Sequence, residues 1–200
     1  KIMKPAKKFV AIMILGRVGS GKDTQAKLLA EKFGLVHIIS SKLLEKAFAG
    51  KKKKVKLEGK TYDVVKELRH MHSGALVNFA FVAALINTEI KRVAHSSKGI
   101  IMSASPRSLT ELKMELPVLK ELYGNQYFFI HLWISPEEVY IRNLKRHRKD
   151  LPELDTRKII KKRLDTFNRY TLPVIRKLEK EKNIIEINGE QKIIKIHKDI

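Results

Sequence analysis

The feature that most constrains this chain is a glycine-rich stretch near its amino terminus, at positions 16–22. An apolar run at 9–15 precedes this stretch, and residues 23–30 after it have the composition of a helix. The predicted order is therefore a buried strand, a glycine loop and a helix. Glycines let the backbone turn tightly and point its N–H groups inward, and the helix adds its positive amino-terminal end. The sequence thus predicts an anion-binding loop.

The spacing within the loop indicates that the anion is the phosphate chain of a nucleotide. Gly16, Gly21 and Lys22 fit the pattern G-x-x-x-x-G-K of a P-loop, whose lysine reaches the outer phosphates. Asp23 stands where many P-loops have Ser or Thr, and Thr24 follows it. A glycine-rich turn without a ligand is the alternative, which we set aside because spacing and context agree.

Length and composition set the broad class. Two hundred residues suffice for one domain with a sizeable core, so we expect a single domain over 1–200. The chain contains no cysteine, which excludes disulfides and a cysteine-built zinc site. No apolar run is long enough to cross a bilayer, and the first residues lack the apolar segment of a secretory signal. We expect a cytoplasmic monomer without a membrane partner.

The formal net charge of +21 invites nucleic acid, an anionic surface or polyphosphate ligands as partners. Most of the excess is lysine, spread over predicted helices and loops, and aromatic residues are few. A general preference for lysine explains the bulk of such a charge. We interpret the lysine run at 51–54 as a solvated loop, and an RNA contact is the sharper alternative.

Strands alternate with helices along the rest of the chain. After the first strand at 9–15, we expect strands at 35–39, 99–102, 126–134 and 184–187. We expect further helices at 42–48, 62–72, 75–94, 109–122, 135–147, 156–182 and 191–198, and Pro117 should kink or split the one at 109–122. This alternation predicts an α/β fold, a three-layer sandwich with a parallel five-stranded sheet.

With these elements in place, the chain resembles the adenylate kinases and their nucleoside monophosphate kinase relatives. Positions 16–25 read G-R-V-G-S-G-K-D-T-Q, and the family's G-x-x-G-x-G-K-G-T-Q differs from them only at Asp23. Four other stretches are similar to the family's S-G-x-L-V, G-F-I-L-D-G-F-P-R, K-K-R-L-E-T-Y and P-x-I, namely 73–77, 99–107, 161–167 and 173–175. The distance from Arg146 to Arg163 suits members that have a short lid and lack a zinc module.

The resemblance implies a phosphotransferase on a P-loop NTPase core. Such an enzyme moves the γ-phosphoryl group of ATP, with Mg²⁺, to a nucleoside monophosphate, most simply AMP, and gives two diphosphates. The resemblance also implies a small helical acceptor-binding lobe inserted at 40–82 and a short lid at 147–156. Guanidinium groups grip phosphate oxygens in pairs, so arginines should surround the transferring group. The catalytic residues carried over are Lys22, Arg107, Arg146 and Arg163.

The resemblance further divides the site into a donor half and an acceptor half. Arg142 is expected to stack on the adenine of ATP, and Thr24 to hold Mg²⁺ through water. The lid arginine would be Arg148, although the family's R-x-D-D matches it only after a shift of a few residues. The ATP-binding residues carried over are Gly16, Gly19, Ser20, Gly21, Lys22, Asp23, Thr24 and Arg142. The acceptor-binding residues carried over are Ser40, Glu45, Val77, Arg107 and Glu111.

Two of the acceptor-side residues depart from the family pattern. Glu45 replaces an arginine that contacts the acceptor phosphate, and a carboxylate repels phosphate, so Lys42 or Lys46 would have to substitute. Glu111 replaces a glutamine that reads adenine, and a carboxylate accepts hydrogen bonds but donates none. An altered acceptor base is one interpretation of these changes.

A third departure lies at the end of the strand at 99–102. Ser103 replaces an aspartate that helps hold the water shell of magnesium, and Asp23 is placed to compensate from the loop. Taken together, the departures leave two hypotheses. The first is an active nucleoside monophosphate kinase. The second is an ATP-binding protein on the same scaffold, with a degraded acceptor site, that binds RNA or a ribonucleoprotein.

Overall fold

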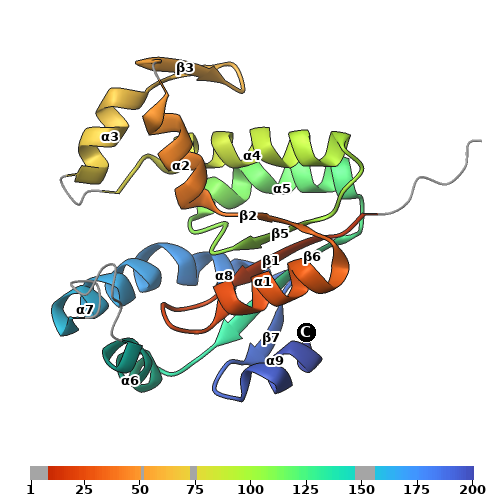
Figure 1. Ribbon diagram of the computed structural model, residues 1–200, viewed down its shortest axis with the longest axis vertical. Coiled ribbons are helices and arrows are strands. Elements are labelled where there is room, and N and C mark those ends of the chain that lie inside the picture. The colour runs from red at the N-terminus through yellow and green to blue at the C-terminus, as the bar shows by residue number, and fades with distance from the viewer. Residues whose placement is uncertain (1–8, 51, 73–75, 147–155) are drawn as a thin grey trace, which may run out of the picture.

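The computed structural model describes residues 9–50, 52–72, 76–146 and 156–200, and at its centre lies a sheet of parallel strands (Figure 1). The five strands follow the order β2-β5-β1-β6-β7 and are all paired in parallel. Their bounds are β1 Ala11–Leu15, β2 Val36–Ile38, β5 Ile100–Ser103, β6 Tyr127–Trp133 and β7 Ile185–Asn188. The predicted α/β fold with a five-stranded parallel sheet is confirmed.

Helices connect the strands and cover the sheet. None of the helices in the described parts of the chain has the length and apolar character needed to span a bilayer. Their bounds are α1 Lys22–Phe33, α2 Ser40–Ala49, α3 Val64–His72, α4 Phe79–His95, α5 Leu109–Tyr123, α6 Pro136–Arg146, α7 Arg157–Thr166, the π-helical turn η2 Phe167–Thr171, α8 Leu172–Lys180 and α9 Ile193–Asp199.

The central strand β1 contributes to a hydrophobic core on each face of the sheet, because successive side chains of a strand point to opposite faces. Met13 and Leu15 are fully buried in a core that α4, α5 and α8 complete. Ile14 points the other way and packs against Leu29 of α1 and Ile196 of α9. Helices therefore cover both faces, as a three-layer sandwich requires.

One predicted segment is different in the structure. Instead of a solvated loop followed by a helix from residue 62, an antiparallel hairpin forms from β3 (Lys54–Leu57) and β4 (Lys60–Asp63). Val55 and Tyr62 are paired and half-buried while lysines alternate with them on the outside, and Gly59 has a positive φ of 78° in the turn. The segment 40–82 is thus not purely helical. The missed signal was the alternation of apolar and polar residues at 54–57.

Several helix ends also differ from the prediction. Helix α4 begins at Phe79, not 75, since the Asn78 side chain accepts hydrogen bonds from two N–H groups of the first turn. Helix α5 continues through Pro117 without splitting. The helix expected at 156–182 is interrupted by η2, and Pro173 lies in the first turn of α8, where its missing N–H costs nothing.

Candidate active site

The glycine loop joins the end of β1 to the start of α1, and its backbone explains its sequence. Gly19 and Gly21 have φ angles of 82° and 90°, values that L side chains rarely adopt. A Cβ atom at Gly19 would also lie 2.5 Å from the Asn143 side chain. Lys22 is the first residue of α1, and its ammonium donates to the Arg17 carbonyl at 3.2 Å across the loop. The lysine is thereby held over the loop rather than directed to bulk solvent.

A cleft of about 570 Å³ opens above the carboxyl ends of β1 and β5. Ligands of open parallel sheets bind at this edge, where the strands end and helices begin. The cleft gathers residues from the loop, from α2, from the end of β5 and from α7. Its polar lining includes Lys22, Asp23, Ser40, Ser103, Arg107 and Arg163. Cationic groups that are far apart in the sequence thus share one cavity with the glycine loop.

A chain of polar contacts crosses the floor of this cleft. The Asp23 carboxylate lies beside the Ser103 side chain, and Ser103 Oγ lies 3.0 Å from Nε2 of His37 in β2. Partial burial raises the pKa of Asp23, but Lys22, Ser103, His37 and Arg107 together outweigh it and lower that pKa below its usual value. For His37, burial disfavours the charged imidazolium and lowers the pKa, and this outweighs the opposite effect of the negative charge on Asp23. At neutral pH an anionic Asp23 therefore faces the cleft beside a neutral His37.

Arg107 follows β5 on a turn whose backbone is held on both sides. Its N–H donates to Glu111 at 2.7 Å, and its carbonyl accepts from the Thr171 hydroxyl at 3.0 Å. The guanidinium is exposed, donates through Nε to the Ala104 carbonyl at 2.8 Å, and lies 3.4 Å from the Ser40 hydroxyl. The turn thus presents the cation into the cleft, next to the amino terminus of α2.

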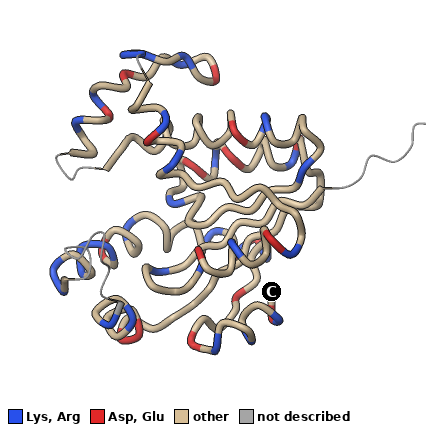
Figure 2. Tube along the Cα trace, viewed as in Figure 1, with Lys and Arg blue, Asp and Glu red and all other residues tan. Residues whose placement is uncertain are grey.

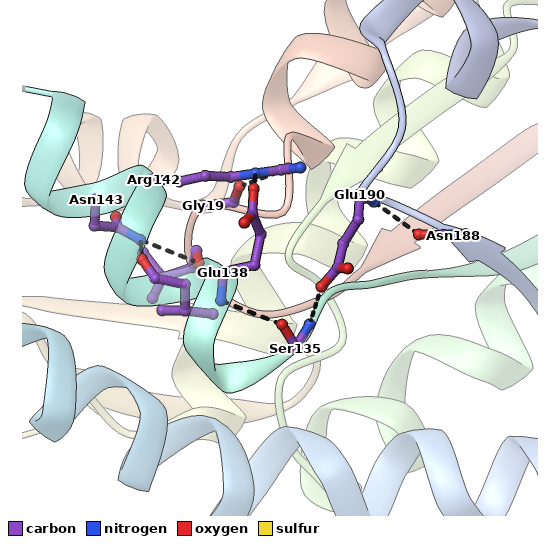
Figure 3. A network of polar contacts seen from close by, with 9 residues as sticks. Gly19, Ser135, Glu138, Arg142, Asn143, Asn188 and Glu190 are labelled. Carbon is purple, nitrogen blue, oxygen red and sulfur yellow. Dashed lines mark hydrogen bonds and ion pairs between the residues drawn. The ribbon is translucent and has the colours of Figure 1, made fainter.

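Helix α6 holds the glycine loop from the other side, as Figure 3 shows. The buried Asn143 donates to the carbonyl of Val18 at 3.3 Å and to that of Val139 at 2.7 Å. Arg142 contacts the Gly19 carbonyl at 3.4 Å while its Nε donates to Glu138 at 2.6 Å. Arg142 was predicted as a site residue and Asn143 was not, because a single asparagine in a helix carries no recognisable motif.

A second cavity, of about 720 Å³, lies beside the loop where α1, α6 and the carboxyl-terminal segment meet. Thr24 and Arg142 line one part of it, and Gln191, Ile193 and Ile194 line another. Ile194 is 73% exposed, which is unusual for an isoleucine. The segment 191–196 was predicted only as part of a helix, with no functional residue. A cavity lined by an exposed isoleucine and by an arginine has the apolar and cationic surfaces on which a planar nucleotide base can stack.

The other predicted residues are divided between these cavities, their margins and the undescribed segments. Gly16 lines the cleft, and Gly19, Ser20 and Gly21 line cavities around the loop. Glu45 is exposed on α2, Val77 packs against the core, and Glu111 is buried; none of the three lines the cleft. The backbone of Arg146 ends α6, whereas Arg148 and the predicted lid at 147–156 lie outside the described residues except for position 156.

Comparison with known proteins gives the family. A model of the family described as "Adenylate kinase" matches residues 14–183, which is most of the chain. The chain belongs to the adenylate kinase family. This family consists of nucleoside monophosphate kinases, and the matched range includes the glycine loop, Arg107 and Arg163. The predicted family is confirmed.

Individual relatives are distant. Over 188 residues, 94% of this chain, the chain is 30% identical to adenylate kinase isoenzyme 5 of Homo sapiens, of which it spans only 31%. It is 29% identical to the adenylate kinase of Leptospira biflexa over 178 residues, which are 89% of this chain and 90% of that protein. It is 24% identical to UMP-CMP kinase 1 of Oryza sativa over 197 residues, 98% of this chain and 74% of that protein.

Proposed function

We propose that this protein is a nucleoside monophosphate kinase that transfers the γ-phosphoryl group of ATP to a monophosphate, with AMP as the first candidate. The observation that carries the proposal is the shared cleft, in which Lys22 of the glycine loop meets Arg107 and Arg163. Phosphoryl transfer asks little covalent chemistry of a protein, and it depends on cations around the transferring group and on exclusion of water. The cleft supplies the cations.

On the donor side, the loop N–H groups and Lys22 bind the phosphates of ATP. The base enters the second cavity, between Arg142 and the exposed isoleucines Ile193 and Ile194. Arg142 is already oriented by its ion pair with Glu138, so little side-chain freedom is lost when it stacks on the base. This arrangement is suited to ATP as the donor. It contacts the adenine by stacking and apolar packing, with few hydrogen bonds to the base.

On the acceptor side, Arg107 grips the monophosphate and aligns its oxygen with the γ-phosphorus. That oxygen forms the new P–O bond while the bond from the γ-phosphorus to the bridging oxygen breaks, and the electron pair stays on the departing ADP. Arg163 of α7, which also lines the cleft, adds positive charge. Ile39, Leu76 and Phe167 add apolar lining beside these cations.

The Mg²⁺ that accompanies ATP in this family finds a suitable donor set here. Asp23 offers a carboxylate, and Thr24 and Ser103 offer hydroxyls, all beside the loop. Magnesium prefers such hard oxygen ligands and keeps several of its waters. When bound, the ion neutralises charge on the phosphate oxygens. The lowered pKa of Asp23 keeps its carboxylate ionised for this role.

Coupled turnover tests the proposal. With ATP and Mg²⁺, we expect diphosphate from AMP, and CMP, UMP and GMP should be compared in parallel. Lys22→Ala should reduce turnover by about a hundred- to a thousandfold, as loss of a transition-state charge contact does. Lys27→Ala on the exposed face of α1 is the matched control and should leave turnover unchanged. A folded wild-type protein that converts none of the four monophosphates would end the proposal.

The second candidate is an ATP-binding protein that uses its basic surface on RNA. It is favoured by the β3–β4 hairpin, which projects from the body of the protein in Figure 2. This hairpin and the residues before it carry exposed lysines, namely Lys52, Lys53, Lys54, Lys56 and Lys60. Affinity for RNA should be measured against salt. Tight, sequence-dependent binding that survives moderate salt supports this candidate, whereas weak binding with a steep salt slope reflects net charge alone.

A further inference from the structure

Two glutamates of α5 lie buried directly behind the turn that carries Arg107. Glu111 is 1% exposed and Glu115 is fully buried, and their four-residue spacing places them on one face of the helix. Carboxylates are rarely buried this completely, since removal of a charge from water is costly. Neither side chain lines the cleft. The role of these two glutamates is therefore to be inferred from their contacts inside the protein.

Those contacts converge on three consecutive residues, Ser105 to Arg107. The Ser105 hydroxyl donates to both carboxylate oxygens of Glu115, at 3.0 and 3.2 Å. The backbone N–H of Arg107 donates to Glu111 at 2.7 Å. Each carboxylate thus holds one end of the turn, and both belong to a helix that is packed into the core. The Thr171 hydroxyl completes the support by donating to the carbonyl of Arg107.

We propose that Glu111 is a positioning residue, which fixes the backbone of Arg107 so that its guanidinium meets the acceptor phosphate, and that it does not read the acceptor base. This inference rests on the proposed kinase function and adds a role for Glu111. A long arginine side chain has many rotamers, so its aim depends on the direction in which the backbone presents it. With its N–H and carbonyl both held, the backbone of Arg107 keeps the direction in which it presents the side chain.

The same geometry shows how a glutamate fits at this position. Its carboxylate points inward and accepts from a backbone donor, so no oxygen atom is directed to the cleft. Burial raises the pKa of Glu111 to about 7, against the lowering effect of the Arg107 N–H and charge, and burial together with Glu111 raises the pKa of Glu115 as well. Both carboxyl groups therefore hold a proton more tightly than an exposed glutamate does, and the neutral form is less costly to bury.

Two substitutions at Glu111 separate positioning from base reading. Glu111→Gln keeps an acceptor for the Arg107 N–H, whereas Glu111→Leu has similar size and no acceptor. We expect Glu111→Leu to raise the acceptor KM about tenfold, with the ATP KM and kcat changed less than about twofold, as loss of one buried hydrogen bond predicts. Glu111→Gln should restore the wild-type acceptor KM and leave the preference among the four monophosphates unchanged. Glu121→Leu, on the exposed side of the same helix, is the matched control.

The opposite results overturn the inference. If Glu111 reads the base, Glu111→Gln will change the ratio of kcat/KM between AMP and the other monophosphates, because an amide donates where a carboxylate cannot. If Glu111 is merely structural, the two variants will lower stability without separating the acceptor KM from kcat. Either outcome removes the positioning role.

A second measurement keeps this test independent of the proposed function. The amide proton of Arg107 should resonate downfield in NMR spectra because it donates to a carboxylate, and the shift should be kept in Glu111→Gln and lost in Glu111→Leu. If wild-type protein turns over no monophosphate, the proposed function fails while this resonance still decides the contact. If turnover occurs but the Arg107 resonance is the same in all three proteins, the inference alone fails.

Discussion

The carboxylate of Asp23 lies beside the hydroxyl of Ser103, which brings the first turn of α1 next to the end of β5. Both positions depart from the family pattern, in which a glycine follows the P-loop lysine and an aspartate ends this strand. The two departures meet in space. The cleft therefore has a carboxylate beside the phosphate loop. This carboxylate comes from α1, whereas in the family pattern it comes from the end of the strand.

Because the two side chains lie together, we predict that an aspartate at position 103 can replace the aspartate at position 23. Asp23→Asn should raise the Mg²⁺ concentration needed for half-maximal turnover by about ten- to a hundredfold, because the site loses its ionised oxygen donor. Ser103→Asp alone puts two carboxylates in contact, which disfavours the ionised form of one of them. The double variant Asp23→Asn with Ser103→Asp should recover most of the loss. A magnesium titration of the three variants checks this. An unchanged magnesium requirement in Asp23→Asn would contradict it.

Arg107 should matter for the acceptor more than for ATP. Its guanidinium faces the cleft near Ser40, at the start of the predicted acceptor lobe. We expect Arg107→Ala to raise the acceptor KM by about ten- to a hundredfold, which is the usual effect of losing a charge-assisted hydrogen bond. Arg107→Lys should recover only part of this, because an ammonium does not contact two phosphate oxygens in a planar fork. Steady-state kinetics with each substrate varied in turn measure both constants.

A control for this experiment is Arg176→Ala, since Arg176 is exposed on α8 and does not line the cleft. It should leave both Michaelis constants unchanged. An acceptor KM that Arg107→Ala leaves at the wild-type value would show that the acceptor phosphate binds elsewhere.

Asn143 should support the glycine loop from helix α6. The buried amide donates to Val18 in the loop and to Val139 within α6. Asn143→Ala leaves the Val18 carbonyl without this donor and should lower the free energy of unfolding by about 1–3 kcal/mol. Because the loop loses its anchor, the KM for ATP should rise more than that for the acceptor. Chemical denaturation and steady-state kinetics check the two effects, and an unchanged ATP KM would show that the loop keeps its shape without Asn143.

Most helices and strands could be predicted from local sequence patterns, because the apolar runs and glycines that determine them lie within short segments. The apolar run before Gly16 predicts a buried strand, and the glycines and Lys22 predict the loop and the helix after it. The order of strands in the sheet, β2-β5-β1-β6-β7, has no such local signal, and it was not predicted. The hairpin at 54–63 was missed because a lysine run was interpreted by its charge and not by its alternation.

The site was predictable only in part, for a related reason. Lys22 and Arg107 belong to motifs with recognisable spacing, and the cleft brings them together. Glu111 could be assigned a position but not an orientation, since nothing in the sequence shows that its carboxylate turns towards the Arg107 N–H. His37 and Asn143 act through contacts with residues more than sixty positions away. Contacts of this kind appear only once the chain is folded.

The buried Glu111 makes stability depend on pH. Burial raises its pKa from 4.5 to about 7 in the folded protein, so between these values the folded state binds more protons than the unfolded chain. The contribution of Glu111 to stability is therefore fully present below pH 4.5, falls as the pH rises, and is lost above about 7. A shift of this size corresponds to about 3 kcal/mol.

Glu111→Gln removes this titration while keeping an acceptor for the Arg107 N–H. Relative to the wild type, the variant should become progressively more stable as the pH rises from about 4.5 to about 7, by up to about 3 kcal/mol, and the difference should be constant at higher pH. Urea denaturation at several pH values measures the difference, with Glu121→Gln as the control for removal of an exposed carboxylate from the same helix. A difference between variant and wild type that is independent of pH would mean that Glu111 is ionised at its normal pKa in the fold, and that the turn before α5 holds an ordinary carboxylate.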